Sequence, residues 1–262
     1  MSGQNLPNGA LTAEGCANYD GLSQRLAFDG LQMNPYTVQG PHLDWAQVNE
    51  RQLAGERLPL FINGHPYTGD HIICAGMYRE LAKRWQLNIF TRPGLHQTVC
   101  LLTQGIADVD TIEIYEPQHD AYAASLKNAV VLRMGDHLDT NFDHNNFDVI
   151  WYSQAGIEFR HRWDSFQVPV IEQISKPNGE YVFVHDRPEL NKATLPFAGE
   201  RPRPEAHIFS HRDLILGAKA LHCVSSSFAA FADSLDLSGK NLNFYPFGRE
   251  IPKHKHNWKI WA

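Results

Sequence analysis

Hydrophobic positions along the chain form short apolar runs that alternate with helix-periodic segments from residue 58 onward. Runs rich in β-branched and aromatic residues predict strands, and apolar residues at three- and four-residue spacing predict helices. Because strands separated by such helices pair in parallel through right-handed crossovers, this series predicts a Rossmann-like sheet. The expected strands are residues 58–63, 87–93, 111–117, 129–134 and 147–153, with helices from Asp70 and over residues 95–105 and 121–128.

A second, shorter series follows a polar connector at residues 159–179. Before both series, residues 1–41 lack clear periodicity and residues 42–55 predict a short helix, so this part is expected to be a lead-in segment. The segment 187–207 is rich in proline and is expected to be an excursion beside a site. The second series has expected strands at 180–186, 206–210, 221–226 and 241–247, and expected helices at 212–220 and 227–235.

Composition narrows the class of protein. A chain of 262 residues that is 43% hydrophobic can bury one or two cores. Neither a basic, apolar leader nor a membrane-length apolar run is present, so a cytoplasmic protein without a transmembrane segment is expected. The four cysteines show no CxxC spacing, and Cys74, Cys100 and Cys223 lie in apolar segments that favour buried thiols. A net charge of -6 argues against a general polyanion-binding surface, although the last fifteen residues are locally basic and aromatic.

The first junction with chemical information is the turn between the strand at 58–63 and the next helix. Gly64 and Gly69 permit close backbone approaches, and Asp70 stands at the expected helix start. An aspartate there can be an N-cap or a general base, and the sequence leaves both readings open. The polar residues around it are His65, Tyr67 and His71, and each also fits the interpretation of an ordinary loop residue.

The second junction is the serine turn after the strand that begins at residue 221. Free amides at a helix start, together with hydroxyl donors, suit a phosphate group, although three serines are also ordinary capping residues. Arg187, at the end of the strand at 180–186, is well placed to neutralise a phosphate. The residues of this expected anion site are Ser225, Ser226, Ser227 and Phe228, with His185 and Asp186 in the neighbouring loop.

These segments together resemble the nucleotide-sugar-dependent glycosyltransferases of GT-B architecture, most nearly the heptosyltransferase-like branch and related small bacterial and phage proteins. The resemblance runs from about residue 58 to 261 and is carried by "GDHIICAGMYRELAKRW", "FRHRWDSFQVP", "YVFVHDRPE", "LHCVSSSFAAFADSL" and "HNWKIW". It implies two Rossmann-like α/β domains facing a cleft, the second one small. The implied division is a lead-in at 1–57, an acceptor domain at 58–155, and a sugar-nucleotide domain at 156–262 whose tail packs back on the first domain.

The resemblance also assigns chemistry. Asp70 occupies the position of the branch's general base, with His65 as the next candidate, and the loop at 225–228 would hold the donor diphosphate. The implied reaction is inverting transfer of a sugar from a nucleotide-sugar to an acceptor hydroxyl, with no further cofactor. The acceptor is left open between a glycan, a lipid-linked sugar and a modified DNA base such as a hydroxymethylpyrimidine. No residue equivalent to the branch's second-domain lysine is identifiable.

Metal independence is expected as well. Asp108 and Asp110 have the DxD spacing of some sugar transferases, but they precede a strand at the end of the sheet away from the ligand edge. The acidic segment at 135–148 matches no metal-site spacing, so both are expected to be surface loops. The rival interpretations are an epimerase, a phosphate-ester hydrolase, and a non-catalytic module that binds nucleotide-sugar or nucleic acid.

Overall fold

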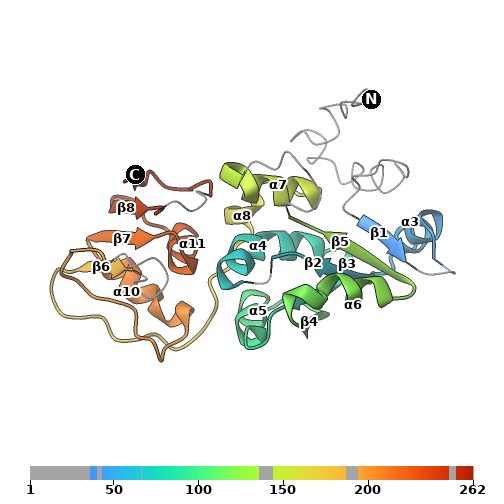
Figure 1. Ribbon diagram of the computed structural model, residues 1–262, viewed down its shortest axis with the longest axis horizontal. Coiled ribbons are helices and arrows are strands. Elements are labelled where there is room, and N and C mark those ends of the chain that lie inside the picture. The colour runs from blue at the N-terminus through green and yellow to red at the C-terminus, as the bar shows by residue number, and fades with distance from the viewer. Residues whose placement is uncertain are drawn as a thin grey trace, which may run out of the picture. The chain divides into compact units, whose positions relative to one another are not determined.

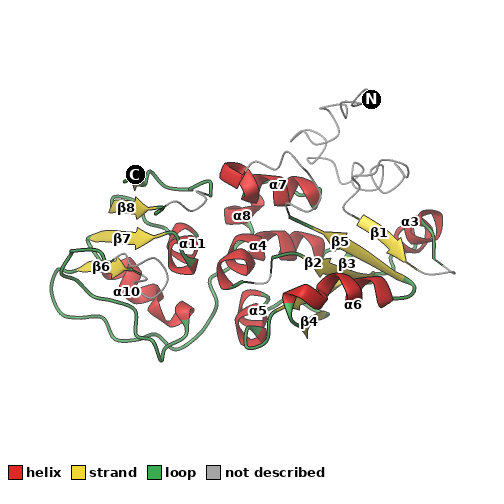
Figure 2. Cartoon of the chain, viewed as in Figure 1, coloured by secondary structure: helices red, strands yellow, loops and turns green. Residues whose placement is uncertain are grey.

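The structure is a computed structural model that describes residues 36–39, 43–65, 67–135, 144–186, 194–247 and 252–261 (Figure 1). The chain divides into two compact units. Unit 1 runs to residue 143 and includes 147–166, and unit 2 comprises residues 144–146 and 167–262. Each unit is an α/β layer structure with its own mainly parallel sheet, as Figure 2 shows by the separate groups of strands. The predicted α/β class with Rossmann-like sheets is therefore confirmed at this level.

The sheet of unit 1 has the strand order β1-β5-β2-β3-β4. Strands β2 to β5 run parallel, and β1 pairs antiparallel with β5 at one edge. Ile62 on the central strand lies between Ile89 of β3 and Leu132 of β5, and all three side chains are buried. The two central strands, β2 and β5, are apolar on both faces because helices cover both. The strands of this sheet are β1 (Tyr36–Gln39), β2 (Leu58–Asn63), β3 (Trp85–Thr91), β4 (Val109–Glu113) and β5 (Ala129–Arg133).

Helices of unit 1 cover both faces of this sheet. The crossovers from β2 to β3 and from β3 to β4 advance in one direction, whereas the crossover from β4 to β5 returns past β2. Right-handed connections therefore put the helix between β4 and β5 on the opposite face. On that face Ala123 packs with Phe90 and Val131. The elements are α3 (Trp45–Leu53), α4 (Thr68–Leu81), α5 (His96–Leu102), η2 (Glu116–Gln118), α6 (His119–Ser125), α7 (Phe147–Gln154) and α8 (His161–Asp164).

The strand predicted at residues 147–153 is wrong, because this segment forms helix α7. An apolar run of that length does not distinguish a strand from a buried helix. The positions that the helix buries are Phe147, Asp148, Trp151, Tyr152 and Gln154. Their spacing of three and four residues is the helical period, and it includes a charged residue that an apolar count passes over.

The lead-in segment and the connector both contribute to unit 1. Residues 36–39 form the edge strand β1, and the hydroxyl of Tyr36 donates to the carbonyl of Ala155 at 2.7 Å. Helix α3 is capped by Asp44, whose side chain forms a capping box with Gln47. Residues 156–166, expected in the second domain, belong to unit 1 because α8 packs on α4. A Cβ atom on Gly76 of α4 would stand 1.9 Å from the carbonyl oxygen of His161, so glycine permits this contact.

The sheet of unit 2 has the order β6-β7-β8-β9, all parallel. Helix α11 packs its apolar side on one face, where Phe231 contacts Phe209 at 5.0 Å between ring centroids. The elements are η4 (His144–Asn146), β6 (Val182–His185), η5 (Ile208–His211), α10 (Arg212–Gly217), β7 (Ala220–Val224), α11 (Ser227–Asp233), β8 (Asn241–Tyr245) and β9 (Lys259–Ile260).

One expectation for unit 2 is corrected. The strand predicted at 206–210 is instead the 3-10 turn η5, which His207 caps through the amide of Phe209. The C-terminal tail contributes strand β9, which extends the sheet of unit 2 beside β8, and its packing on the first domain stays a prediction. Trp258 of the tail donates from Nε1 to the buried carboxylate of Asp233 at 2.9 Å. A backbone ladder, the indole hydrogen bonds of Trp258 and Trp261, and the contacts of Lys255 and His256 with Asp233 and Leu235 therefore attach the tail to its own unit.

The structure confirms two of the three buried thiols that the sequence predicts. Cys74 and Cys223 are buried thiols, as predicted, whereas Cys100 is exposed because it lies on the outer side of the short helix α5. Among the described residues, every helix is too short or too polar to span a bilayer.

Candidate functional site

The strand order of unit 1 fixes where a ligand can bind. The chain runs outward from β2 to β3 and β4 and then returns past β2 to β5, so the strand order reverses between β2 and β5, and the switch point of the sheet lies there. Ligands of open α/β sheets bind outside the carboxyl ends of the strands at such a point. The turn at 64–70 follows β2, and Met134 and Gly135 follow β5. The amide of Met134 donates to the carbonyl of Asn63 at 2.9 Å, which joins the two strand ends.

Asp70 lies in this turn, in the first turn of α4, but it is not the N-cap. The N-cap is Tyr67, with extended φ and ψ of −98° and 158°, and its side chain makes no capping hydrogen bond. Asp70 is the third helical residue and is half-buried. A carboxylate at this position complements the positive end of the helix dipole. The N-cap interpretation is therefore corrected, and Gly69 is the helical residue immediately before Asp70.

Aromatic side chains border the same turn. The imidazole of His65 stacks on the indole of Trp151 from α7, with centroids 5.1 Å apart and planes 22° apart. The guanidinium of Arg92, just after β3, lies 5.0 Å from the ring centroid of Tyr67. Tyr67 is 46% exposed, so this cation–π pair stands at the surface of the carboxyl edge. The turn thus presents flat side chains and a positive charge beside Asp70's helix.

A second polar group lies at the ends of β2 and β5. The side-chain amide of Asn63 donates to Asp120 of α6 at 2.9 Å, and Arg133 forms an ion pair with the same carboxylate at 3.4 Å. The side-chain oxygen of Gln154 in α7 accepts a hydrogen bond from the amide of Gly135, and its side-chain nitrogen donates to the carbonyl of Gly135. These contacts fix both sides of the switch point with side chains from two strands, β2 and β5, and two helices, α6 and α7. A Cβ atom on Gly64 would meet the flexible end of Met134 at 2.9 Å, so the two chains pass closely here.

His71, expected in the cleft, is instead a core residue with 1% exposure. Its Nδ1 lies 2.9 Å from the hydroxyl of Tyr78, and its Nε2 lies 3.0 Å from the hydroxyl of Thr91. Burial, with a smaller effect of His119, lowers the pKa of His71 to about 3. The imidazole is therefore neutral near pH 7, and it joins α4 to β3 inside unit 1. The correction follows from the helix: residue 71 turns inward when α4 begins at Thr68.

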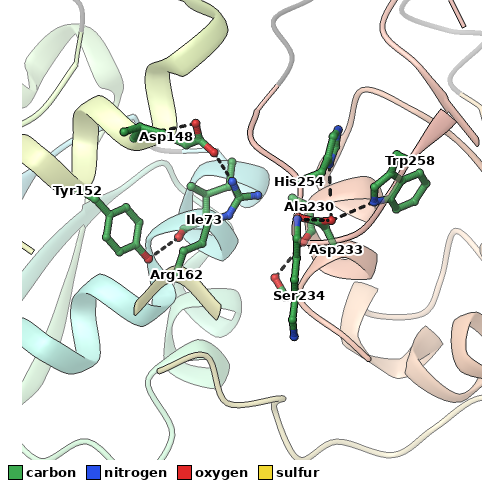
Figure 3. A network of polar contacts seen from close by, with 11 residues as sticks. Ile73, Asp148, Tyr152, Arg162, Ala230, Asp233, Ser234, His254 and Trp258 are labelled. Carbon is green, nitrogen blue, oxygen red and sulfur yellow. Dashed lines mark hydrogen bonds and ion pairs between the residues drawn. The ribbon is translucent and has the colours of Figure 1, made fainter. Parts of the chain in front are cut away.

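Helix α4 is also held from outside by a hydroxyl. Figure 3 shows Tyr152 pointing its hydroxyl at the carbonyl of Ile73, to which it donates at 2.9 Å. The hydroxyl oxygen of Tyr152 also accepts a hydrogen bond from the amide of Met77 at 3.1 Å. Ile73 and Met77 are the two residues that an ordinary α-helix pairs with each other. A side chain inserted at this step of the ladder is a known cause of helix bending, and it sets the course of the helix that carries Asp70.

In unit 2 the serine turn lies at the carboxyl edge of the sheet, between the ends of β6 and β7. Ser226 is the N-cap of α11, and its oxygen accepts from the amide of Ala229 at 3.3 Å. The same hydroxyl donates to the carbonyl of Val224 at 3.0 Å. It also lies 3.0 Å from Nδ1 of His185, which is the last residue of β6. Since one hydroxyl carries one hydrogen, the contact with His185 requires its Nδ1 to donate.

The other predicted residues of this edge take different places. Ser225 donates its amide to the carbonyl of Tyr245 at 3.1 Å, and Ser227 begins α11. The ring of Phe228 packs 4.6 Å from His185 and 5.1 Å from His211, so its side chain belongs to an aromatic cluster. The capping interpretation of the serine turn is thus confirmed for its central residue.

Asp186 holds the long loop that follows β6. Its carboxylate accepts from the amide of Leu195 at 3.1 Å and forms an ion pair with Arg201 at 3.1 Å. Burial by itself would raise the pKa of Asp186, but these hydrogen bonds outweigh burial and lower it. Asp186 is therefore an ionised structural partner of the loop. Arg187 lies outside the described residues.

The acidic segments have no ligand-binding geometry among the described residues, where no three histidine, cysteine or carboxylate side chains converge as a metal site requires. Asp108 immediately precedes β4 and pairs with Arg57 at 2.8 Å, which confirms its place at the amino edge of the sheet. In the segment 135–148, residues 136–143 lie outside the described residues. Asp148 is fully buried and ion-paired with Arg162, so it is not a surface residue.

Sequence reasoning missed several residues of the unit 1 site. Trp151 was assigned to a strand, and the strand ends at residues 63, 92 and 133 carried no recognisable motif. One signal was available: each of these polar residues ends or directly follows an apolar strand, and such positions converge at one edge of a parallel sheet. The residues missed are Asn63, Arg92, Asp120, Arg133, Trp151 and Gln154.

Comparison of the chain with models of protein families, with curated proteins and with solved structures finds no match. The geometry of the two units is therefore the basis for any functional conclusion.

Proposed function

We propose that the protein is a glycosyltransferase that moves a sugar from a nucleotide-sugar donor to an acceptor hydroxyl, with inversion and without a metal ion. The observation that carries the proposal is the position of the Gly-Asp turn at the switch point between β2 and β5 of unit 1. This is the ligand position of an open parallel sheet, and Asp70 is the ionisable residue of the turn's helix start. Unit 1 would bind the acceptor, and unit 2 the donor.

In the proposed reaction, a carboxylate oxygen of Asp70 takes the proton of the acceptor hydroxyl while the hydroxyl oxygen of the acceptor bonds to the anomeric carbon of the donor. The bond from the anomeric carbon to the donor phosphate breaks, and the nucleoside diphosphate leaves with the electron pair. The half-buried position of Asp70 suits a base that must reach substrate while water is restricted. His65, stacked on Trp151, is the alternative base, and the aromatic pair forms a flat wall for a sugar ring.

In unit 2, the serine turn and Arg187 are proposed to stabilise the leaving diphosphate. The geometry limits which groups contribute. The hydroxyl of Ser226 is already engaged with Val224, Ala229 and His185, so the hydroxyl of Ser227, the first residue of α11, is better suited to contact phosphate. His185 would position the turn through Ser226 rather than contact the donor.

The Asp70→Asn variant tests the base assignment. Asparagine keeps the shape of the side chain, and loss of the helix-dipole interaction should cost only ~0.3–1 kcal/mol of stability. Transfer should fall ~10²–10⁴-fold in single-turnover assays at saturating donor, because a placed base typically contributes that much. Asp110→Asn, at an exposed aspartate of β4, is the matched control and should retain full activity. Transfer by Asp70→Asn within a factor of three of wild type would refute the assignment.

The donor is identified by thermal stabilisation across a panel of sugar nucleotides, where saturation at 100 times Kd adds about 2.7 kcal/mol to the folded state. Incubation with the stabilising donor alone then separates the rival enzymes, since an epimerase gives an altered sugar and a hydrolase releases phosphate. Donor binding without any reaction across an acceptor panel would support the non-catalytic module instead. Activity should survive excess EDTA, and loss that magnesium or manganese restores would overturn metal independence.

A further inference from the structure

One face of the unit 2 sheet carries a row of near-parallel rings, which we call the aromatic row. His222 of β7 and Tyr245 of β8 have ring centroids 6.0 Å apart and planes 21° apart. Trp261, directly after β9, lies 6.2 Å from Tyr245 with planes only 7° apart. Phe247 flanks Tyr245 at 6.3 Å and 22°, and Phe197 lies 3.9 Å from His222. The row thus crosses three adjacent strands.

Among the described residues, no helix packs on the face of the sheet that carries the aromatic row. Helix α11 packs on the opposite face, and the row's face is covered at one end by the loop at 194–201. There Leu195 packs against Val184 and Val224. The loop reaches the row through Phe197, and farther along the row Trp261 is 43% exposed and Phe247 46% exposed. Large aromatic side chains left exposed on one face of a sheet usually mark a binding surface.

The charge around the row is positive. The ammonium of Lys259 lies 3.6 Å from the ring centroid of Trp261. The tail that delivers Trp261, residues 252–261, contains three exposed lysines and two histidines and no carboxylate. Among the acidic groups that face this tail, the carboxylate of Asp233 is buried and accepts hydrogen bonds from the indole of Trp258 and the amide of Lys255. The lysines are Lys253, Lys255 and Lys259.

Asp236, a further acidic group near the tail in the described part of the chain, accepts hydrogen bonds from Ser238. Burial lowers the pKa of His222, so this member of the row is an uncharged ring near pH 7. The surface therefore combines neutral flat rings with cations supplied from one side.

We propose that the aromatic row is a docking surface for single-stranded nucleic acid, whose bases stack on Trp261 and Phe247 while its phosphates face Lys259 and the tail lysines. Exposed aromatic rings joined to a basic track are how sequence-tolerant single-strand binding is built. A second copy of the chain suits the surface less, since a twofold contact through Trp261 would bring two Lys259 ammonium groups together. This proposal is independent of the glycosyltransferase activity.

The test uses the full chain and a fluorescein-labelled twelve-residue oligothymidylate, with binding measured by fluorescence anisotropy at 50 mM salt. Trp261→Ala and Phe247→Ala should each weaken binding roughly 5- to 150-fold, the usual effect of losing one stacked base. Trp261→Phe keeps an aromatic ring and should retain most of the affinity. Tyr115→Ala, at a 66% exposed tyrosine of unit 1, is the matched control and should bind like wild type.

A salt titration separates stacking from charge. Lys259→Gln should reduce the dependence of log K on log salt by about 0.7, the slope for one phosphate contact on a single strand. The proposal is overturned if wild type shows no saturable binding at 50 mM salt, or if Tyr115→Ala weakens binding as much as Trp261→Ala. It is also overturned if thymidine monophosphate competes as well as the oligomer does, or if sedimentation shows a dimer that Trp261→Ala dissociates.

Discussion

The buried ion pair between Asp148 and Arg162 gives the most demanding test of how unit 1 is held together. It joins α7 to α8, and the two side chains are 0% and 1% exposed (Figure 3). The guanidinium also lies 5.2 Å from the ring centroid of Trp163 and 5.9 Å from that of Phe159. Both charges have therefore lost their water, and each depends on the other for compensation.

Removing one partner leaves the other charge buried. Asp148→Asn and Arg162→Met should each lower the free energy of unfolding by ~3–5 kcal/mol, the usual loss for a broken buried pair. Replacing both, as Asp148→Leu with Arg162→Met, removes both desolvation costs, so the double variant should be more stable than either single variant. For a unit of this size, 3–5 kcal/mol corresponds to a fall in Tm of roughly 6–20 °C.

Urea unfolding followed by tryptophan fluorescence and by circular dichroism provides the assay. Unit 1 contains four of the six tryptophans, Trp45, Trp85, Trp151 and Trp163, so its transition dominates the fluorescence. The control is Arg51→Met, which breaks an exposed pair with Glu56 and should cost less than ~1 kcal/mol. A single variant that loses less than 1 kcal/mol, or a double variant less stable than both singles, would refute the reasoning.

Two further predictions concern helix α4. Gly76→Ala should destabilise unit 1 by ~1–3 kcal/mol in the same urea assay, because the new Cβ would stand 1.9 Å from a backbone oxygen of α8. An unchanged unfolding midpoint would contradict this prediction and show that α8 is free to move. The pKa of His71 is lowered to about 3 in the folded protein, from ~6.5 in the unfolded chain. Between these two pH values the imidazole is protonated in the unfolded chain and neutral in the folded protein. The free energy of unfolding therefore falls as the pH drops through this range. His71→Gln should therefore lose less stability than wild type between pH 6.5 and pH 4, and parallel pH profiles would contradict the assignment.

The sequence by itself determined the local elements and their class. Strands β2, β3 and β5 are apolar runs with no competing pattern, and α4 and α11 have helical spacing from a polar start, so both Rossmann-like sheets could be predicted. The serine turn and the Gly-Asp turn were found for the same reason, because each interrupts an apolar pattern at a strand-to-helix junction. Local pattern failed at residues 147–153 and 206–210, where short apolar runs suit either a strand or a helical turn.

Only the tertiary structure decided which polar residues meet. Asn63, Asp120 and Arg133 lie far apart in sequence, and they come together because the order β4-β3-β2-β5 places β5 beside β2. The order of strands depends on long-range packing and on the sense of each crossover, neither of which leaves a local signal. The same holds for His71, whose burial depends on a helix start two residues before the expected one, and for the aromatic row, which forms only when β9 pairs with β8. Residue types thus indicate what chemistry a chain can perform, whereas strand pairing decides where those residues are assembled.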